Sequence, residues 1–277
     1  LEKAREVRNE AGGLIPILRN ASKIVTNNTR GAELLPEGIK ASATSLFDRF
    51  LYALHAPERN LHVQLKNQKE LSKLLAKDES KLTKKEKKRI KSLEQYISDK
   101  NGSGMSDADA TAYLDALDPT LRTEFEKAHV ELKKIQQDSR DALRDYGLID
   151  DDMYRYLNSA FNNYVPLHGK SLDEGVVIDG ALMPDDSAYP NIPSRMKIHG
   201  DMIQEATGRG GETADILGKI IQQNANIHIV GQKNLALQKF HNLLEANPDP
   251  TSYSVSKQGN IESPNTLVLY DNGEAKY

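Results

Sequence analysis

Apolar residues recur every three or four positions along most of the first 160 residues, which is the spacing that places them on one face of an α-helix. The most regular stripe alternates steps of four and three between residues 121 and 146. A heptad stripe of this kind suits antiparallel helix packing or a short coiled coil. We therefore expect this segment to form a helix–helix interface through Leu121, Phe125, Leu132 and Ile135.

Helix boundaries can be read from residues that start or stop a helix. We expect Pro57 to end one helix and to open a second that runs to about residue 77, because proline pushes the residue before it out of the α region. Asp118 and Pro119 are expected to open the helix that carries the heptad stripe, and Gly147 to end it.

The pattern changes after residue 164. Residues 165–211 are rich in proline, glycine and aspartate, and their only strand-like run is 176–178. We expect a long irregular crossing there, and loops of this length are usually functional or lie against a partner. A long helix follows, and its middle, around Ile227, Ile229 and Val230, is apolar on several sides and expected to be buried.

Two short strand-like runs, 253–256 and 266–270, follow that helix and indicate a small β element. The predicted fold is therefore mainly α: an elongated multi-helix bundle with a long irregular crossing and a β element at the C-terminal end. Its expected parts are a helical region over 1–164 that contains a charged helical hairpin over about 65–100, the crossing over 165–211, a long helix over 212–250, and the start of a truncated β-containing region over 251–277. Leu1 already lies in helix-like sequence and Tyr277 follows a strand-like run, so we expect further residues on both sides.

A lysine-rich run from residue 81 to residue 91 lies inside the expected hairpin, and Thr83 and Glu86 form a capping-box pattern that predicts a helix start. Clustered basic residues can bind nucleic acid or another anionic surface. The alternative is a solvated helix face, because acidic residues are interleaved and no aromatic residue is present in the run to stack on bases. The candidates for such a contact are Lys84, Lys85, Lys87, Lys88, Arg89 and Lys91.

Residues 99–107 match the first nine positions of a calcium-binding loop, but the twelfth position is Ala110 in place of a bidentate glutamate. Coordination would fall short without that carboxylate. We therefore interpret the segment as a turn followed by a helix N-cap at Ser106, with Asp107 and Asp109 favoured by the helix dipole. No metal site is expected.

Composition limits the classes of function. Only 38% of the 277 residues are hydrophobic and 6% are aromatic, so we expect thin helical layers in place of one deep core. The net charge of -3 provides no global basic field for DNA. The chain has no cysteine, which excludes disulfides, thiol nucleophiles and cysteine-ligated metals. No apolar run approaches the ~20 residues of a membrane-spanning helix.

Candidate catalytic groups are few. The seven histidines are scattered, none lies three or four residues from another, and no metalloprotease or serine-hydrolase motif occurs. The glycine-rich stretch 208–211 precedes a helix but lacks the strand and the Gly-Lys-Ser/Thr of a phosphate-binding loop. We expect no catalytic residue and no cofactor, and we expect each histidine to lie on a helix surface or in an interface.

Five short strings occur in one order along the chain, at residues 55–60, 102–110, 164–167, 206–209 and 246–250. This ordered set resembles the helical regions of very large phage polyvalent proteins, the class often marked by a Pro-Leu-x-Arg-Phe-Gly motif. The resemblance covers about residues 40 to 250. Two features depart from it: Pro166-Leu167 is followed by His168-Gly169 in place of the Arg-Phe pair, and the charged hairpin looks like an insertion.

The resemblance implies an internal virion protein that is packaged with the genome and delivered with it into the host periplasm or cytoplasm, with any enzymatic modules elsewhere in the parent chain. The segment is then expected to be a non-enzymatic structural or assembly region that contacts itself or other virion proteins during packaging or DNA ejection. The alternative is an accessory domain of a large phage enzyme, such as a polymerase, methyltransferase or peptidoglycan-cleaving protein, with a nucleic-acid contact through the charged hairpin.

Overall fold

The computed structural model describes residues 2–27, 42–78, 82–99, 102–160, 162–165, 215–257, 259 and 266–277. In these residues the chain is mainly α, and the predicted fold class, with its small C-terminal β element, is confirmed. Seven helices and two strands are present in the described part: α1 (Glu2–Asn27), α2 (Ala43–Leu75), α3 (Lys84–Asp99), α4 (Asp107–Ala116), α5 (Pro119–Asp145), α6 (Asp151–Ala160), α8 (Ile216–Ala246), β1 (Leu269–Asp271) and β2 (Glu274–Lys276).

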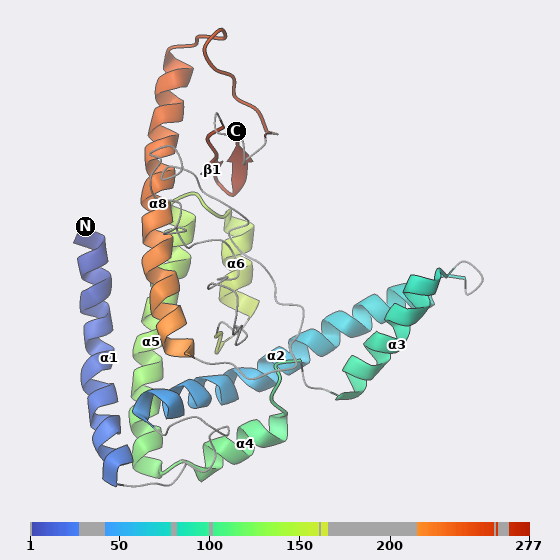
Figure 1. Ribbon diagram of the computed structural model, residues 1–277, viewed down its shortest axis with the longest axis vertical. Helices are drawn as coiled ribbons and strands as arrows, with labels where there is room; N and C mark the ends of the chain where they lie inside the picture. Colours follow the sequence, from blue (N-terminus) through green and yellow to red (C-terminus); the bar gives the residue numbers. More distant parts are fainter. Residues whose placement is uncertain are drawn as a thin grey trace, which may run out of the picture.

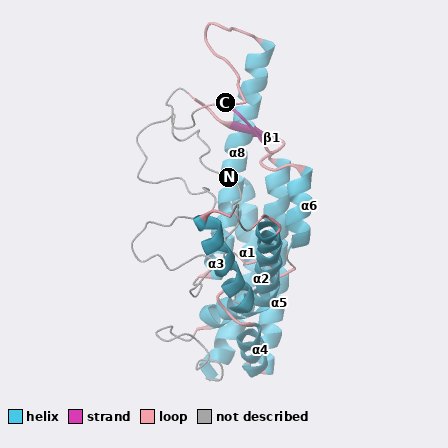
Figure 2. Ribbon diagram, turned by 90° about the vertical axis from the view of Figure 1, so that its right-hand side faces the viewer, coloured by secondary structure: helices cyan, strands magenta, loops and turns pink. Residues whose placement is uncertain are grey.

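Helix α5 lies at the centre of the bundle. Both α1 and α8 pack against it, and the three helices run along the long axis of an elongated molecule (Figure 1). Helix α2 crosses the lower end of this bundle and contacts α4 there. Its distal half extends away from the bundle, and α3 folds back along it, so that these two helices form the charged hairpin expected over residues 65–100 (Figures 1 and 2). None of the described helices is long and apolar enough to cross a membrane.

The boundaries of α5 follow from local chemistry, as predicted. The Asp118 carboxylate accepts hydrogen bonds from the backbone N–H groups of Thr120 (2.9 Å) and Leu121 (3.2 Å), which caps the helix start. At the other end, Gly147 takes a φ of 70°, a left-handed conformation that glycine adopts without a steric cost. The N–H of Leu148 then donates to the carbonyl of Leu143 at 2.9 Å, which closes the helix.

The heptad stripe of α5 lies in the larger of two hydrophobic clusters. Leu121, Phe125, Leu132 and Ile135 are each no more than 2% exposed. Helices α1, α2, α4 and α8 all contribute side chains to the same cluster, so these four residues face several helices at once. At its centre, the ring of Phe125 lies 5.3 Å from that of Phe47 and 5.6 Å from that of Phe50, within the range of favourable aromatic pairs.

The smaller cluster joins the C-terminal end of α5 to the middle of α8. Tyr146 and Ile149 are buried there against Ile227 and Leu237. The two helices approach closely at Gly231, where an added Cβ would lie 1.9 Å from the Tyr146 ring. Only glycine fits this position without moving the ring.

The prediction that Pro57 ends a helix is wrong, because α2 runs without a break from Ala43 to Leu75. Proline inside a helix costs roughly 3 kcal/mol, since it has no N–H to donate and its ring crowds the preceding turn. The turns on both sides of Pro57 are buried, with Ala53, Ala56 and Asn60 at 4% exposure or less. Tertiary packing therefore outweighs the local preference.

The C-terminal β element is smaller than predicted and shifted. β1 and β2 pair antiparallel through a turn at Asn272 (φ 51°) and Gly273 (φ 81°), the positive φ pair that an Asn-Gly hairpin turn requires. The strand expected over 253–256 does not form. Ser256 instead exchanges two backbone hydrogen bonds with Tyr277, at 3.0 and 2.8 Å.

Several expectations fall on parts of the chain outside the described residues. They are the irregular crossing beyond Val165, its strand-like run 176–178 and the glycine-rich stretch 208–211.

The buried stripe of α5 yields a stability prediction. We expect Leu132→Ala to lower the free energy of unfolding by roughly 2–5 kcal/mol, because Leu132 is 0% exposed and its truncation leaves a cavity. Val130→Ala is the matched control on the same helix, where the side chain is 56% exposed, and should cost less than about 0.5 kcal/mol. Urea denaturation measures both, and equal losses would contradict the assigned packing.

Candidate functional site

The charged hairpin begins with a capping box at the start of α3, as predicted. The N–H of Thr83 donates to the Glu86 carboxylate (2.9 Å), and the N–H of Glu86 donates to the Thr83 hydroxyl (3.2 Å). Leu93, which is 0% exposed, anchors α3 to α2. Ile90 and Ile97 are half-buried beside it. These contacts fix which side of α3 faces α2 and which faces away from it.

Two ion pairs hold α3 to α2. The guanidinium of Arg89 binds both carboxylate oxygens of Glu70, at 2.8 and 2.7 Å, and the ammonium of Lys77 binds Glu86 at 2.6 Å. The bond from Arg89 lowers the pKa of Glu70, and the bonds from Lys77 and Thr83 lower the pKa of Glu86 to about 2. Arg89, one of the candidate contact residues, therefore takes part in holding the hairpin together.

The other five candidates form one surface. Their side chains are all exposed, and no ion pair between described residues involves any of them. Four of them follow each other at helical spacing on the side of α3 that is turned away from Leu93. We call this surface the lysine face; it consists of Lys84, Lys85, Lys87, Lys88 and Lys91.

A second exposed surface lies on α8, and sequence reasoning missed it. Ile229, Lys233, Ala236, Phe240 and Leu243 follow the alternating four and three spacing of a heptad and form what we call the α8 stripe. The three large apolar side chains of the stripe are 45%, 47% and 59% exposed. The prediction that Ile229 is buried with Ile227 and Val230 is therefore wrong, because Ile229 points away from α5. The heptad spacing in the sequence could have revealed this stripe.

A buried polar cluster connects α5 to α8 beneath the opposite side of α8. The side-chain amide nitrogen of Asn224, which is 0% exposed, lies within hydrogen-bond distance of three acceptors: the carbonyl of Ile135 (3.2 Å), Asp138 (3.0 Å) and the Ser139 hydroxyl (2.9 Å). One turn further along α8, the ring of His228 lies between Asp138 and Tyr146.

His228 lies between a carboxylate and a hydroxyl, and a carboxylate, an imidazole and a hydroxyl in a row can form a proton relay. Nε2 of His228 lies 2.9 Å from Asp138, and Nδ1 lies 3.0 Å from the Tyr146 hydroxyl. Both ring nitrogens are thus engaged within the protein, and the Ser139 hydroxyl donates to the Ile135 carbonyl at 3.0 Å. This geometry supports a structural role for His228, which joins α5 to α8 through its two hydrogen bonds. The 90 residues that separate Asp138 from His228 explain why sequence spacing did not reveal it.

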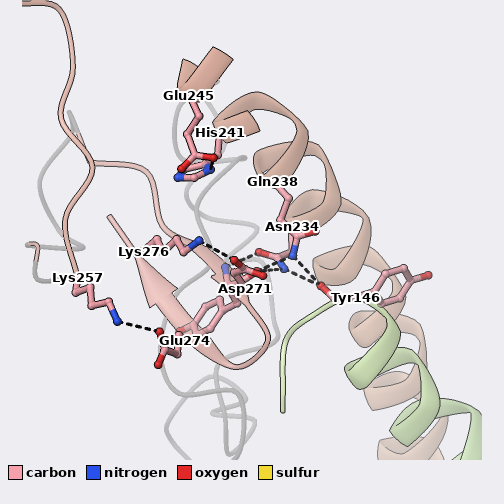
Figure 3. A network of polar contacts seen from close by, with 10 residues as sticks. Tyr146, Asn234, Gln238, His241, Glu245, Lys257, Asp271, Glu274 and Lys276 are labelled. Carbon is pink, nitrogen blue, oxygen red and sulfur yellow. Dashed lines mark hydrogen bonds and ion pairs between the residues drawn. The ribbon is translucent and has the colours of Figure 1, made fainter. Parts of the chain in front are cut away.

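The polar contacts continue to the C-terminal hairpin (Figure 3). The side chain of Asn234 donates to the carbonyls of Tyr146 and Tyr270, both at 2.8 Å, and accepts from the N–H of Tyr270 at 2.7 Å. Gln238 donates to the same Tyr270 carbonyl at 2.7 Å. These two side chains of α8 therefore join the end of α5 to β1.

Residues 102–107 of the segment that matched part of a calcium loop are held by hydrogen bonds to α2 and by the cap of α4. Asn60 of α2 accepts from the N–H of Ser103 (2.7 Å) and donates to the carbonyl of Met105 (2.9 Å), and Tyr52 donates to the Ser103 carbonyl (2.7 Å). Ser106 caps α4 through the N–H of Asp109, as predicted. In the part of the chain that the structure describes, no group of three or more histidine or acidic side chains could hold a metal ion.

The other described histidines lie at helix contacts or are partly exposed. Burial lowers the pKa of His55 to about 3, with a further contribution from Arg59, so its ring is neutral at physiological pH. Burial also lowers the pKa of His129 to about 4. His168 and His199 lie outside the described residues.

Asp48 of α2 binds the N-terminus of α8. Its carboxylate accepts from the N–H of Leu217 at 2.9 Å. Burial raises the pKa of Asp48 to about 6, and this effect exceeds the opposing effect of the backbone hydrogen bonds. The ionised form of Asp48 is therefore disfavoured in the folded protein relative to the unfolded chain.

Comparison with known proteins identifies no relative, since no family model, curated protein or solved structure matches the chain.

The buried Asp48 yields a pH prediction. Because its pKa is about 6 in the folded protein against an ordinary 3.8, its contribution to stability is full below pH 3.8 and falls as the pH rises to about 6. The asparagine of Asp48→Asn cannot ionise. The free energy of unfolding of this variant, relative to that of the unsubstituted chain, should therefore rise by roughly 1–3 kcal/mol between about pH 4 and pH 7.

Asp115→Asn, at an exposed position of α4, is the control and should track the parent protein across the same range. Denaturation at several pH values checks both variants. A difference between Asp48→Asn and the parent protein that stays constant with pH would contradict the burial of this carboxylate.

Proposed function

We propose that this chain is a non-enzymatic structural segment of a large phage internal virion protein, and that it acts through protein–protein contacts during packaging or genome delivery. It would lie in the virion interior and enter the host with the genome. The phage assignment is supported by the ordered strings between residues 55 and 250. The structural role is supported by an elongated helical bundle in which buried polar side chains join α5 to α8.

The observation that carries the proposal is the α8 stripe. Single exposed apolar residues are common on protein surfaces and need no explanation. The α8 stripe differs because Ile229, Phe240 and Leu243 lie on one face of the helix at heptad spacing, which suits packing against another helix. The stripe runs from Ile229 to Leu243, which is 15 residues, or about 21 Å of helix between the two ends. This length is enough to seat three turns of a partner helix.

Charge indicates what kind of helix would fit. Helix α8 carries lysines at 219, 233 and 239, and its sequence contains no acidic residue before Glu245. Two copies of the α8 stripe packed face to face would bring Lys233 and Lys239 of one copy close to the same lysines of the other copy, and like charges repel. A helix with an apolar seam and acidic flanks is the better match. Another virion protein, or a different surface of a second copy of this chain, could supply it.

The alternative function, an accessory domain of a large phage enzyme, depends on the charged hairpin and on a module outside this chain. The hairpin is separate from the α8 stripe, so a contact through one does not exclude a contact through the other.

The test of the assembly role is a phage that carries Phe240→Ser and Leu243→Ser in the parent protein. We expect particles to contain several-fold less of the parent protein and infectivity to fall, because the apolar seam is lost at a position that does not affect the core. Quantitative mass spectrometry of purified particles measures the first effect.

The matched control is Ile15→Ser with Val130→Ser, since these side chains are 55% and 56% exposed on other helices. Circular dichroism of each purified variant checks that the fold is retained. Normal incorporation and infectivity of the Phe240/Leu243 variant would overturn the proposal. So would hydrolysis of DNA, nucleotide or peptidoglycan by the purified chain.

A further inference from the structure

Charge is distributed unevenly between the charged hairpin and the rest of the chain. Residues 65–100 contain twelve lysine and arginine residues against six acidic residues, a net charge of +6. The whole chain has a net charge of -3, so the remaining residues sum to -9. The hairpin projects from the bundle (Figure 1), and the field of the molecule would orient it toward a negatively charged partner.

Two acidic residues near the lysine face are turned away from it. Glu86 is turned toward Thr83 and Lys77, on the side of α3 that approaches α2. Glu70 binds Arg89 on that side as well. These carboxylates are occupied in building the hairpin, and they do not neutralise the five lysines on its outer side. Of the acidic residues of α3 whose side chains the structure describes, Glu94 alone stays beside the lysine face, and five lysines against one glutamate leave that side strongly basic.

The lysine face is unfavourable for the helix that carries it. Lys84 and Lys85 occupy the first positions of α3, where the helix dipole disfavours positive charge. Lys84 and Lys88, and likewise Lys87 and Lys91, are spaced four residues apart, where like charges destabilise a helix by about 0.2–0.5 kcal/mol per pair. Local rules are typically broken where a function requires it.

The composition of the lysine face limits which class of partner can bind it. Lysine is depleted in protein–protein interfaces, whose binding energy comes from aromatic and apolar side chains, and the lysine face has none. Stable binding of a helix to a membrane surface combines basic residues with apolar side chains that insert, and Leu93 and Ile90 face α2 instead. Residues 84–91, over which the lysine face extends, contain no aromatic side chain to stack on the bases of a single strand, and the first aromatic residue after them is Tyr96.

The remaining class of partner is double-stranded nucleic acid, whose phosphates match the lysine face. The lysine face extends from Lys84 to Lys91, about 10 Å along the helix. A DNA duplex presents about six phosphate charges over that length, enough for each lysine to reach one. We propose that the lysine face of α3 binds the phosphate backbone of double-stranded nucleic acid without sequence preference. This contact does not rest on the proposed assembly role, because it uses another surface.

The experiment measures binding of the intact chain to a fluorescent duplex of about 20 base pairs by anisotropy, between about 50 and 200 mM salt. Four phosphate contacts predict a slope of about -3.6 for log affinity against log salt, and so a loss of roughly 100-fold over that range. Combined Lys84→Gln, Lys87→Gln, Lys88→Gln and Lys91→Gln should weaken binding at least tenfold at the lower salt and flatten the slope by about 3.6.

The matched control removes the same amount of charge elsewhere: Lys127→Gln, Lys133→Gln, Lys134→Gln and Lys239→Gln, at exposed positions of α5 and α8. It should change the affinity less than about twofold. Circular dichroism of both variants establishes that the hairpin is still helical.

Three results would overturn the proposal. The first is an absence of duplex binding at about 50 mM salt. The second is an equal loss in the control variant, which would mean that net charge alone matters. The third is preference for a different anion. Displacement of the duplex by polyglutamate as readily as by unlabelled duplex would assign the lysine face to an acidic protein. Binding to phosphatidylglycerol vesicles in place of the duplex would assign it to a membrane.

Discussion

The contact between α5 and α8 is the constraint on which the rest of this molecule depends. Asn224 and Asn234 are both 0% exposed, so water cannot replace a hydrogen-bond partner that either side chain loses. Leaving such a group unsatisfied costs about 1–3 kcal/mol. A shift of α8 by one residue would turn these side chains away from Ser139, Asp138 and the Tyr146 carbonyl. The polar contacts therefore fix the register of α8, while the apolar clusters supply the driving force for packing.

This register determines what the molecule exposes. Because Asn224, His228 and Asn234 face α5, the α8 stripe on the opposite side of the helix is exposed to solvent. At the other end of the bundle, α2 is held by Phe47 and Phe50 in the larger cluster, so its distal half extends away and carries α3 with it. One rigid core thus presents two separate surfaces, an apolar seam and a lysine face. A scaffold in contact with both protein and genome would need these two kinds of surface.

The sequence predicted what local rules decide. Heptad spacing identified the buried side of α5, and the Thr83, Ser106 and Asp118 patterns located three helix starts. Contacts between residues far apart in the sequence could not be predicted in this way. Helix α2 continues through Pro57 because both flanking turns are buried. His228 contacts Asp138 only because α5 and α8 are adjacent in the fold. Two local signals were present but not used. They are the Asn272-Gly273 turn and the helical spacing that collects the lysines of α3 on one face.

The most direct test of the α5–α8 register is hydrogen exchange in an Asn234→Ala variant. This change removes three hydrogen bonds that join the end of α5 and β1 to α8. We expect amides of residues 266–277 to exchange much faster than in the parent protein, with the Tyr270 amide among the most affected, while residues 121–135 keep their protection. Unchanged protection of residues 266–277 would contradict the account. So would a uniform loss of protection along α5, which would mean that the two ends of the bundle are not held by separable contacts.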